Sequence, residues 1–448
     1  MGQEYGSSQG ERYGRAVSPK SRGRKQKPGA GRRRSTGRPP AAGPPNLARP
    51  VAQALEPTLF EGVPFPAEAL MSHLLGTVWA GVEYDRAGGV EDFSAQLVAD
   101  SVKGAGGRAT LELLSRIAPP RAADKAAEVA SMATGPVPQW APLLDRVELV
   151  DAIATRDIFG DQTNYAMLFG YHDRGRVVGR HILVAMVDHN LRLLKDAFLV
   201  EDMSLEQFAD FYRTEPDLYV DPEPDLAWMA GDIIRAMDIT DMTLDVVDML
   251  GEATADTWYL LRSRIRRCLP PPAPDPEDYP TADRQKDLRA FMRAKITTDF
   301  LATEVDGSLP DRETVAYLAQ LFIDYACDRS RGAPTEWSPT AVELFLVDFA
   351  PRKVVWEAED IPWVVPKLKV FVEWAQKRRQ IVVRGRRETQ AAIDRFGGDF
   401  VYGALGGAEP SFARGLVEGM IAAGVDLNDE AAIGAYVEEY NRRIDEGQ

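Results

Sequence analysis

The sequence predicts a mainly helical α+β protein, and three observations support this fold class. Apolar residues recur at helical spacing between residues 66 and 132. Short β-prone runs separated by turn residues occupy about residues 147–200, which predicts a small antiparallel β-meander. From residue 281 onward the recurring patterns are helical, so the C-terminal part is expected to be all-α.

A proline-rich stretch divides the folded part of this 448-residue chain in two. Leu269–Pro280 holds six prolines in twelve residues, which favours an extended linker over a helix or a central strand. We therefore expect a basic disordered arm at 1–50, a helical domain with the inserted meander at 55–268, the linker at 269–280 and an all-helical domain at 281–448.

The first domain opens with helices. In the first of them, Leu70, Leu74 and Val78 recur at helical spacing, and the alanine-rich last one has high helix propensity. The expected helices are Pro66–Val82, Phe93–Val102, Leu111–Ile117 and Arg121–Met132.

The meander follows at about residue 147. Thr163–Tyr171 and Val177–Val187 are expected strands, joined by a turn at Asp173–Gly175. Asp188–Asn190 is a second turn candidate, after which Ala197–Val200 is expected to return as a short strand. The middle of the second run is apolar on both faces, so helices must cover the sheet.

Helices resume at Ser204, which forms a capping box with Gln207 three positions later. Pro222–Ala236 and about Glu252–Arg267 complete the first domain. The helices expected in the second domain are Asp283–Leu301, Pro310–Cys327, Thr340–Phe349, Lys367–Arg379, Ser411–Ala423 and Asp429–Arg443. In the last of these, Asn428 is expected to be the N-cap, with Asp429 in the first turn.

The N-terminal arm carries opposite charge to the rest of the chain. Residues 1–50 hold twelve Lys or Arg against two Glu, a net of +10, which leaves −25 on the remaining residues of a chain whose net charge is −15. Such an arm is expected to attract nucleic acid without reading its sequence. The candidate nucleic-acid-binding residues are Lys20, Arg22, Arg24, Lys25, Lys27, Arg32, Arg33 and Arg34. Two alternatives remain: the arm binds an acidic protein surface, the chain's own included, or it is a solvated tail.

The sequence indicates no export or membrane signal. Residues 1–50 lack the apolar stretch of a secretory signal, and no apolar run approaches the roughly 18 residues of a membrane span. The two cysteines, Cys268 and Cys327, exclude a disulfide framework and an all-cysteine zinc site. We therefore expect a cytoplasmic protein, and no cofactor is predicted.

Three of the four histidines lie in the meander, among several aspartates. Asp/His clusters can hold a divalent metal and activate water, and His189 with Asp161 or Asp196 is the combination least excluded. The alternation of side chains between the two faces of a strand argues against a shared metal site. If the hairpin pairs His172 with Arg176, then His181 pairs with Met167 and the two imidazoles lie on opposite faces.

Two charged clusters have mainly structural interpretations. Asp238, Asp241, Asp245 and Asp248 would form one acidic stripe on a helix, as a solvated face or a docking surface for the arm. Lys377–Arg379 with Arg384, Arg386 and Arg387 could contact phosphate, but favourable, solvated charge at a helix C-terminus is the preferred explanation. The glycine-rich runs lack the Lys-Ser/Thr of a P-loop, and the Gly6–Gly10 match to a nucleophile elbow lies in the arm.

Two segments bear a likeness to other proteins: Gly160–Thr163 through Val187–Asn190 with Lys195–Phe198, and Val342–Val354. They resemble segments of functionally uncharacterised actinobacterial proteins. The resemblance implies a bacterial cytoplasm and no particular activity, so it assigns no catalytic residue.

The function predicted from the sequence is that of a non-enzymatic interaction or adaptor protein. Its basic arm would add nonspecific attraction to nucleic acid or another anionic surface. The alternative is a metal-dependent hydrolase that uses Asp and His residues of the meander.

Overall fold

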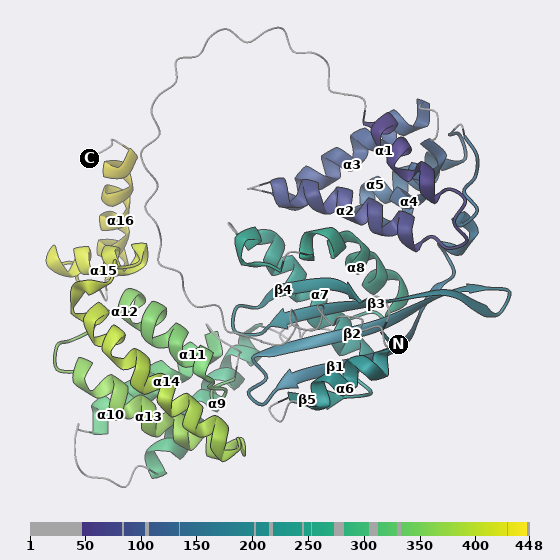
Figure 1. Cartoon of the computed structure of the whole chain (residues 1–448). Helices are drawn as coiled ribbons and strands as arrows, with labels where there is room; N and C mark the ends of the chain where they lie inside the picture. The colour runs from purple at the N-terminus through teal and green to yellow at the C-terminus, as the bar shows by residue number, and fades with distance from the viewer. Residues whose placement is uncertain are drawn as a thin grey trace, which may run out of the picture. The chain divides into compact units, whose positions relative to one another are not determined.

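The computed structural model describes residues 47–82, 85–103, 107–133, 135–200, 203–214, 218–243, 246–251, 253–272, 282–303, 312–328, 333–427 and 429–445. In these residues the mainly helical α+β fold is confirmed: a five-stranded antiparallel sheet lies in the middle of the chain, with helices before and after it (Figure 1).

Five helices precede the sheet. They are α1 Ala48–Leu55, α2 Phe65–Gly81, α3 Arg86–Lys103, α4 Gly107–Ile117 and α5 Pro120–Ala130. The four expected helices correspond to α2–α5, and α1 was not predicted. It begins within the segment expected to be the arm, because Ala48, Val51 and Leu55 are buried and pack as a helix on the described helices that follow.

The expected meander is larger than predicted. Its strands are β1 Val147–Asp157, β2 Gln162–Asp173, β3 Arg176–Asp188, β4 Leu193–Val200 and β5 Leu218–Asp221. The spatial order is β4-β3-β2-β1-β5, and all neighbours are antiparallel. β5 was not predicted; it is a four-residue strand that pairs with the end of β1 after an intervening helix.

Three further helices cover the two faces of the sheet. They are α6 Leu205–Arg213, α7 Leu226–Met242 and α8 Thr254–Cys268. Alternate residues of β3 separate the faces: Leu183 and Ala185 join the large core with α2, α7 and α8, whereas Ile182 and Val184 join a smaller core under α6. The predicted capping box of α6 is present, with Ser204 and Gln207 bonded to each other's backbone amides.

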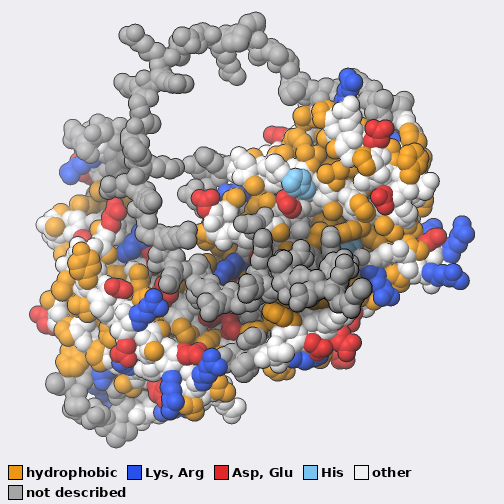
Figure 2. Space-filling model, viewed as in Figure 1, with side chains coloured by type: hydrophobic (Ala, Val, Ile, Leu, Met, Phe, Trp, Pro, Cys, Tyr) orange, Lys and Arg blue, Asp and Glu red, His pale blue; other side chains and the backbone are white. Residues whose placement is uncertain are grey.

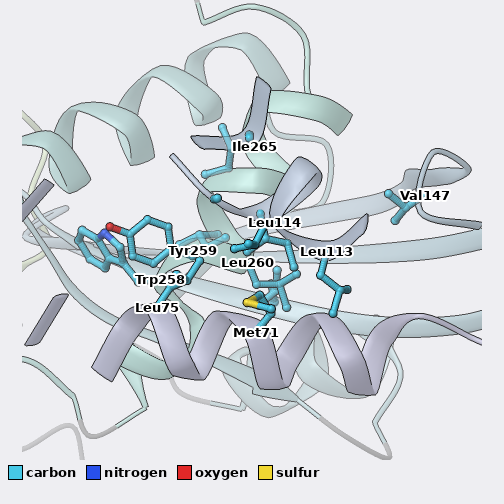
Figure 3. Close-up of a cluster of buried hydrophobic side chains, with 14 of the residues drawn as sticks. Met71, Leu75, Leu113, Leu114, Val147, Trp258, Tyr259, Leu260 and Ile265 are labelled. Carbon is cyan, nitrogen blue, oxygen red and sulfur yellow. The ribbon is translucent and has the colours of Figure 1, made fainter. Parts of the chain in front are cut away.

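The large core is densest between α2 and α8. Met71 and Leu75 of α2 lie beside Leu260 and Trp258 of α8 (Figure 3). The rings of Trp79 and Trp258 stack with their centroids 4.3 Å apart, and both side chains are fully buried. This contact joins helices that lie far apart in the sequence.

The C-terminal part is helical, as expected. Its elements are α9 Ala282–Thr303, α10 Arg312–Asp328, α11 Pro339–Glu343 with a π-helical continuation Leu344–Phe349, α12 Ala350–Lys353, α13 Ile361–Arg378, α14 Val383–Tyr402, a second π-helical segment Gly403–Gly407, α15 Phe412–Ala422 and α16 Glu430–Asp445. A separate aromatic core holds it together, with Phe371 in contact with the rings of Phe300, Phe322 and Trp374.

Two details of this part differ from expectation. No helix was expected between Arg379 and Ser411, but α14 forms there from Val383, and its buried Thr389, Ile393 and Phe400 provide a packed face. Asp429 is the cap of α16 and no part of its first turn, since its Oδ1 accepts from the amides of Ala431 and Ala432. The predicted cap, Asn428, lies outside the described residues, as does most of the predicted linker.

None of the described helices combines the length and the apolar character needed to cross a membrane.

Candidate functional site

The predicted nucleic-acid-binding residues, Lys20 to Arg34, lie outside the part of the chain that the structure describes. The candidate sites whose contacts the structure describes lie on the sheet, on the helices around it and on the C-terminal helices.

His189 lies in the turn after β3, where its backbone amide donates to the carbonyl oxygen of Asp161 at 2.9 Å. Its Nε2 is 2.8 Å from Oγ1 of Thr163 and 3.9 Å from Oδ2 of Asp232. Asp232 in turn accepts from the hydroxyl of Tyr165 at 2.7 Å. The imidazole is thus one member of a small hydrogen-bonded group at one end of β2 and α7.

Asp196 belongs to a different neighbourhood. It lies on β4, and its Oδ1 accepts from the hydroxyl of Thr254 on α8 at 3.0 Å. Burial raises the pKa of this carboxyl group, although the Thr254 hydroxyl and the Ala197 amide act in the opposite direction. Within the described ranges, no group of three or more His, Cys, Asp or Glu side chains is placed to hold a metal ion. His189, Asp161 and Asp196 therefore do not form the metal site that the alternative required.

The hairpin register differs from the one expected. The β2–β3 turn has two residues, Arg174 and Gly175, both with positive φ (+47° and +79°), as in a type I′ turn. Asp173 pairs with Arg176, and a bulge beyond His172 shifts the register again, so His181 pairs with Phe169 instead of Met167. The two imidazoles still lie on opposite faces, as predicted.

His181 belongs to a buried polar network that the sequence analysis missed. The Arg264 guanidinium donates from Nη2 and Nη1 to the Glu68 carboxylate at 2.6 and 3.1 Å. It also donates from Nη2 to the hydroxyl of Tyr171 at 2.6 Å, and that hydroxyl donates to Glu68. Both charged side chains are fully buried. Their charges therefore compensate each other inside the core.

The network fixes the protonation state of His181. Nε of Arg264 donates to Nε2 of His181 at 3.3 Å, and the imidazole stacks between Phe65 and Phe169. Burial lowers the pKa of His181 well below its usual value, and the charge of Arg264 lowers it further. A neutral ring that accepts at Nε2 carries its proton on Nδ1. His181 is consequently a packed core residue.

One signal could have revealed this network. Glu68 occupies a core-facing position of α2 together with Met71 and Leu75. A carboxylate on an apolar face is rarely buried without a cationic partner. The identity of that partner, 196 positions away on α8, depends on the tertiary fold.

The predicted acidic stripe does not form. The helix ends at Met242, Asp248 lies in a separate 3₁₀ turn, and Asp245 is outside the described residues. Asp238 and Asp241, however, share one partner: Nη2 of Arg262 lies 3.1 Å from Asp238 and 2.5 Å from Asp241. Asp238 and Asp241 therefore form a half-buried ion-pair group with Arg262, which holds α7 against α8.

The basic cluster at the end of α13 is largely paired within the protein. Lys377 pairs with Glu373, and Arg378 pairs with Asp299 and lies over the ring of Trp374. Arg384 pairs with Glu388 on the first turns of α14. These contacts favour the structural interpretation of the cluster over phosphate binding.

A second basic feature, the tip of the β2–β3 hairpin, was not singled out in the sequence. β4 pairs with β3 only from Ile182 to Asp188, so Arg176–His181 extends beyond it as part of a ribbon that projects from the sheet (Figure 1). Arg174, Arg176 and Arg180 are exposed there, and none forms an ion pair with a described residue. Blue side chains gather at this end of the space-filling view (Figure 2).

Comparisons with protein-family models, with curated proteins and with solved structures found no match for this chain.

Proposed function

We propose that this chain is a non-enzymatic interaction protein that associates with double-stranded nucleic acid through its positively charged parts. The observation that carries the proposal is the segregation of charge, with a net of +10 on residues 1–50 and −25 on the rest. A cluster of cations releases counterions when it meets a phosphate backbone, so association is strong at low salt and insensitive to sequence.

The β2–β3 hairpin supports the same proposal from the described part of the chain. A two-stranded antiparallel ribbon is narrow enough to enter a nucleic-acid groove, and arginine is suited to bidentate phosphate contacts. Arg174 in the turn and Arg176 and Arg180 in the strand that follows it lie on such a ribbon, without intramolecular ion pairs among the described residues. The hairpin would therefore add a positioned contact to the nonspecific attraction of the arm.

The net negative charge of the residues after position 50 also bears on this proposal. Because this charge repels the phosphate backbone, only the arm and the hairpin would approach nucleic acid closely. The remaining surface would stay available to another macromolecule, as an adaptor requires. The hydrolase alternative has no comparable support, since the described residues hold no metal-ligating group.

The proposal is tested by removing the positive charge of the arm. A variant that lacks residues 2–46 is expected to bind a labelled DNA duplex at least about tenfold more weakly at low salt, because the cations responsible for counterion release are gone. Fluorescence anisotropy measures this affinity. A matched variant, in which the Lys and Arg residues of the arm are replaced by Gln, separates charge from length and should lose the same affinity. Equal binding by all three proteins would contradict the proposal.

A further inference from the structure

A pocket of about 780 Å³ lies among helices that precede and follow the sheet in the sequence. Side chains of α3, α7 and α8 line it, together with the turn between α4 and α5, and Pro270–Pro272 borders it after the end of α8. Most of its wall is apolar, and Ile117, Ile234 and Ile265 belong to that part. Polar groups converge on the remaining wall, which is the usual composition of a small-molecule site.

Tyr259 provides an unused hydrogen-bonding group in this pocket. Its side chain lines the pocket and is only 5% exposed. Among the described residues, none donates to its hydroxyl or accepts from it. The hydroxyl oxygen is not among the buried polar atoms of the described residues, so it is accessible from the pocket and can bond to a molecule that enters it.

The groups around this hydroxyl are predominantly anionic. Burial raises the pKa of Tyr259 most, the charges of Asp241 and Glu91 raise it further, and Arg262 opposes them. All three of these charged residues line the same pocket, as does Asp238. Two carboxylates and one guanidinium therefore act on Tyr259, which leaves net negative charge beside it, although Arg121 and Arg266 balance the charge of the pocket lining as a whole.

Arg262 does not neutralise this group fully. Its Nη2 contacts both Asp238 and Asp241, and Trp79 Nε1 donates to Asp241 at 2.7 Å. Burial raises the pKa of Asp241 most, and the charge of Asp238 adds to it, against the attraction of Arg262 and Arg86 and the hydrogen bond from Trp79. Glu91 on the same wall forms no ion pair with a described residue, so a further cation beside it would be stabilised.

We propose that this pocket binds a small organic amine with an apolar body. The ammonium group would lie among Glu91, Asp238 and Asp241 and donate to the Tyr259 hydroxyl. The apolar body would contact Ile117, Ile234, Ile265 and the prolines that follow α8. Arg121 and Arg266 line the pocket as well and are exposed, so a second ammonium group at the far end of the ligand would be repelled.

Benzylamine is a suitable probe, because it joins one ammonium group to one aromatic ring, and benzoate is its anionic counterpart. Ligand-observed NMR on the full chain should show benzylamine binding at about millimolar affinity and no comparable binding of benzoate. Asp238→Asn and Tyr259→Phe should each weaken benzylamine binding by about three- to tenfold, which corresponds to the loss of one charged or polar contact. Asp210→Asn, an exposed change on α6, is the matched control and should leave binding unchanged.

The proposal is overturned if benzylamine does not bind, if benzoate binds as tightly, or if neither pocket variant changes its affinity. Asp238 is about half exposed, so Asp238→Asn is compatible with folding, and thermal unfolding of each variant verifies that the fold persists. The outcome is independent of nucleic-acid binding, since the pocket contains no residue of the arm or the hairpin.

Discussion

Replacing Glu68 with Ala is expected to lower the free energy of unfolding by about 3–5 kcal/mol, because the substitution leaves the Arg264 guanidinium buried without its counter-ion. Both side chains are fully buried, and Arg264 has no route to solvent that would restore its hydration. Tyr171 would also lose the acceptor of its hydroxyl proton. Urea unfolding followed by tryptophan fluorescence and circular dichroism measures the change.

Two further variants separate charge from packing. Glu128→Ala removes one member of the exposed pair with Lys125 and should change stability by less than about 1 kcal/mol. The double variant Glu68→Leu with Arg264→Met removes both buried charges and should recover much of the lost stability, since no unpaired ion remains. If Glu68→Ala is as mild as Glu128→Ala, the buried ion pair does not have the energetic role assigned to it.

Phe371→Ala is expected to destabilise the C-terminal helical part by about 3–5 kcal/mol through loss of buried surface and formation of a cavity. The side chain is fully buried. Its ring centroid lies 5.1 Å from that of Phe300, 5.6 Å from that of Phe322 and 5.7 Å from that of Trp374. Urea unfolding monitored by far-UV and near-UV circular dichroism measures this decrease in the free energy of unfolding.

The neighbouring position gives the matched control. Val370 is on the same helix and 44% exposed, so Val370→Ala should change stability by less than about 1 kcal/mol. A similar effect of the two substitutions would show that the aromatic cluster is not the core of this part of the chain.

The regular elements with strong local signals were predictable from the sequence. The apolar spacing in α2, the alanine-rich composition of α5 and the Ser204–Gln207 pair before α6 each specify a helix within a few residues of its observed position. The elements that were missed have weaker local signals. β5 is only four residues long, and α14 begins at Val383 directly after Ile381 and Val382, whose β propensity obscures the helix that follows.

The site features depend more on tertiary structure. A two-residue turn and a bulge set the register of the β2–β3 hairpin, and neither was apparent from turn composition alone, although the opposite faces of His172 and His181 were predicted. The Glu68–Arg264 pair joins positions 196 residues apart, and residues of five helices, α3, α4, α5, α7 and α8, line the pocket beside Tyr259. Contacts between residues so far apart in the sequence cannot be predicted from the spacing of residues within one helix or strand.

The slope of binding affinity against salt concentration tests the proposed function most directly. With the full chain and a DNA duplex, the logarithm of the association constant should fall linearly with the logarithm of salt concentration, by about 0.9 for each phosphate neutralised. Replacing Arg174, Arg176 and Arg180 with Gln should make this slope shallower, whereas Arg213→Gln on α6 should not. An affinity that stays constant between about 50 and 200 mM salt would contradict recognition through segregated positive charge.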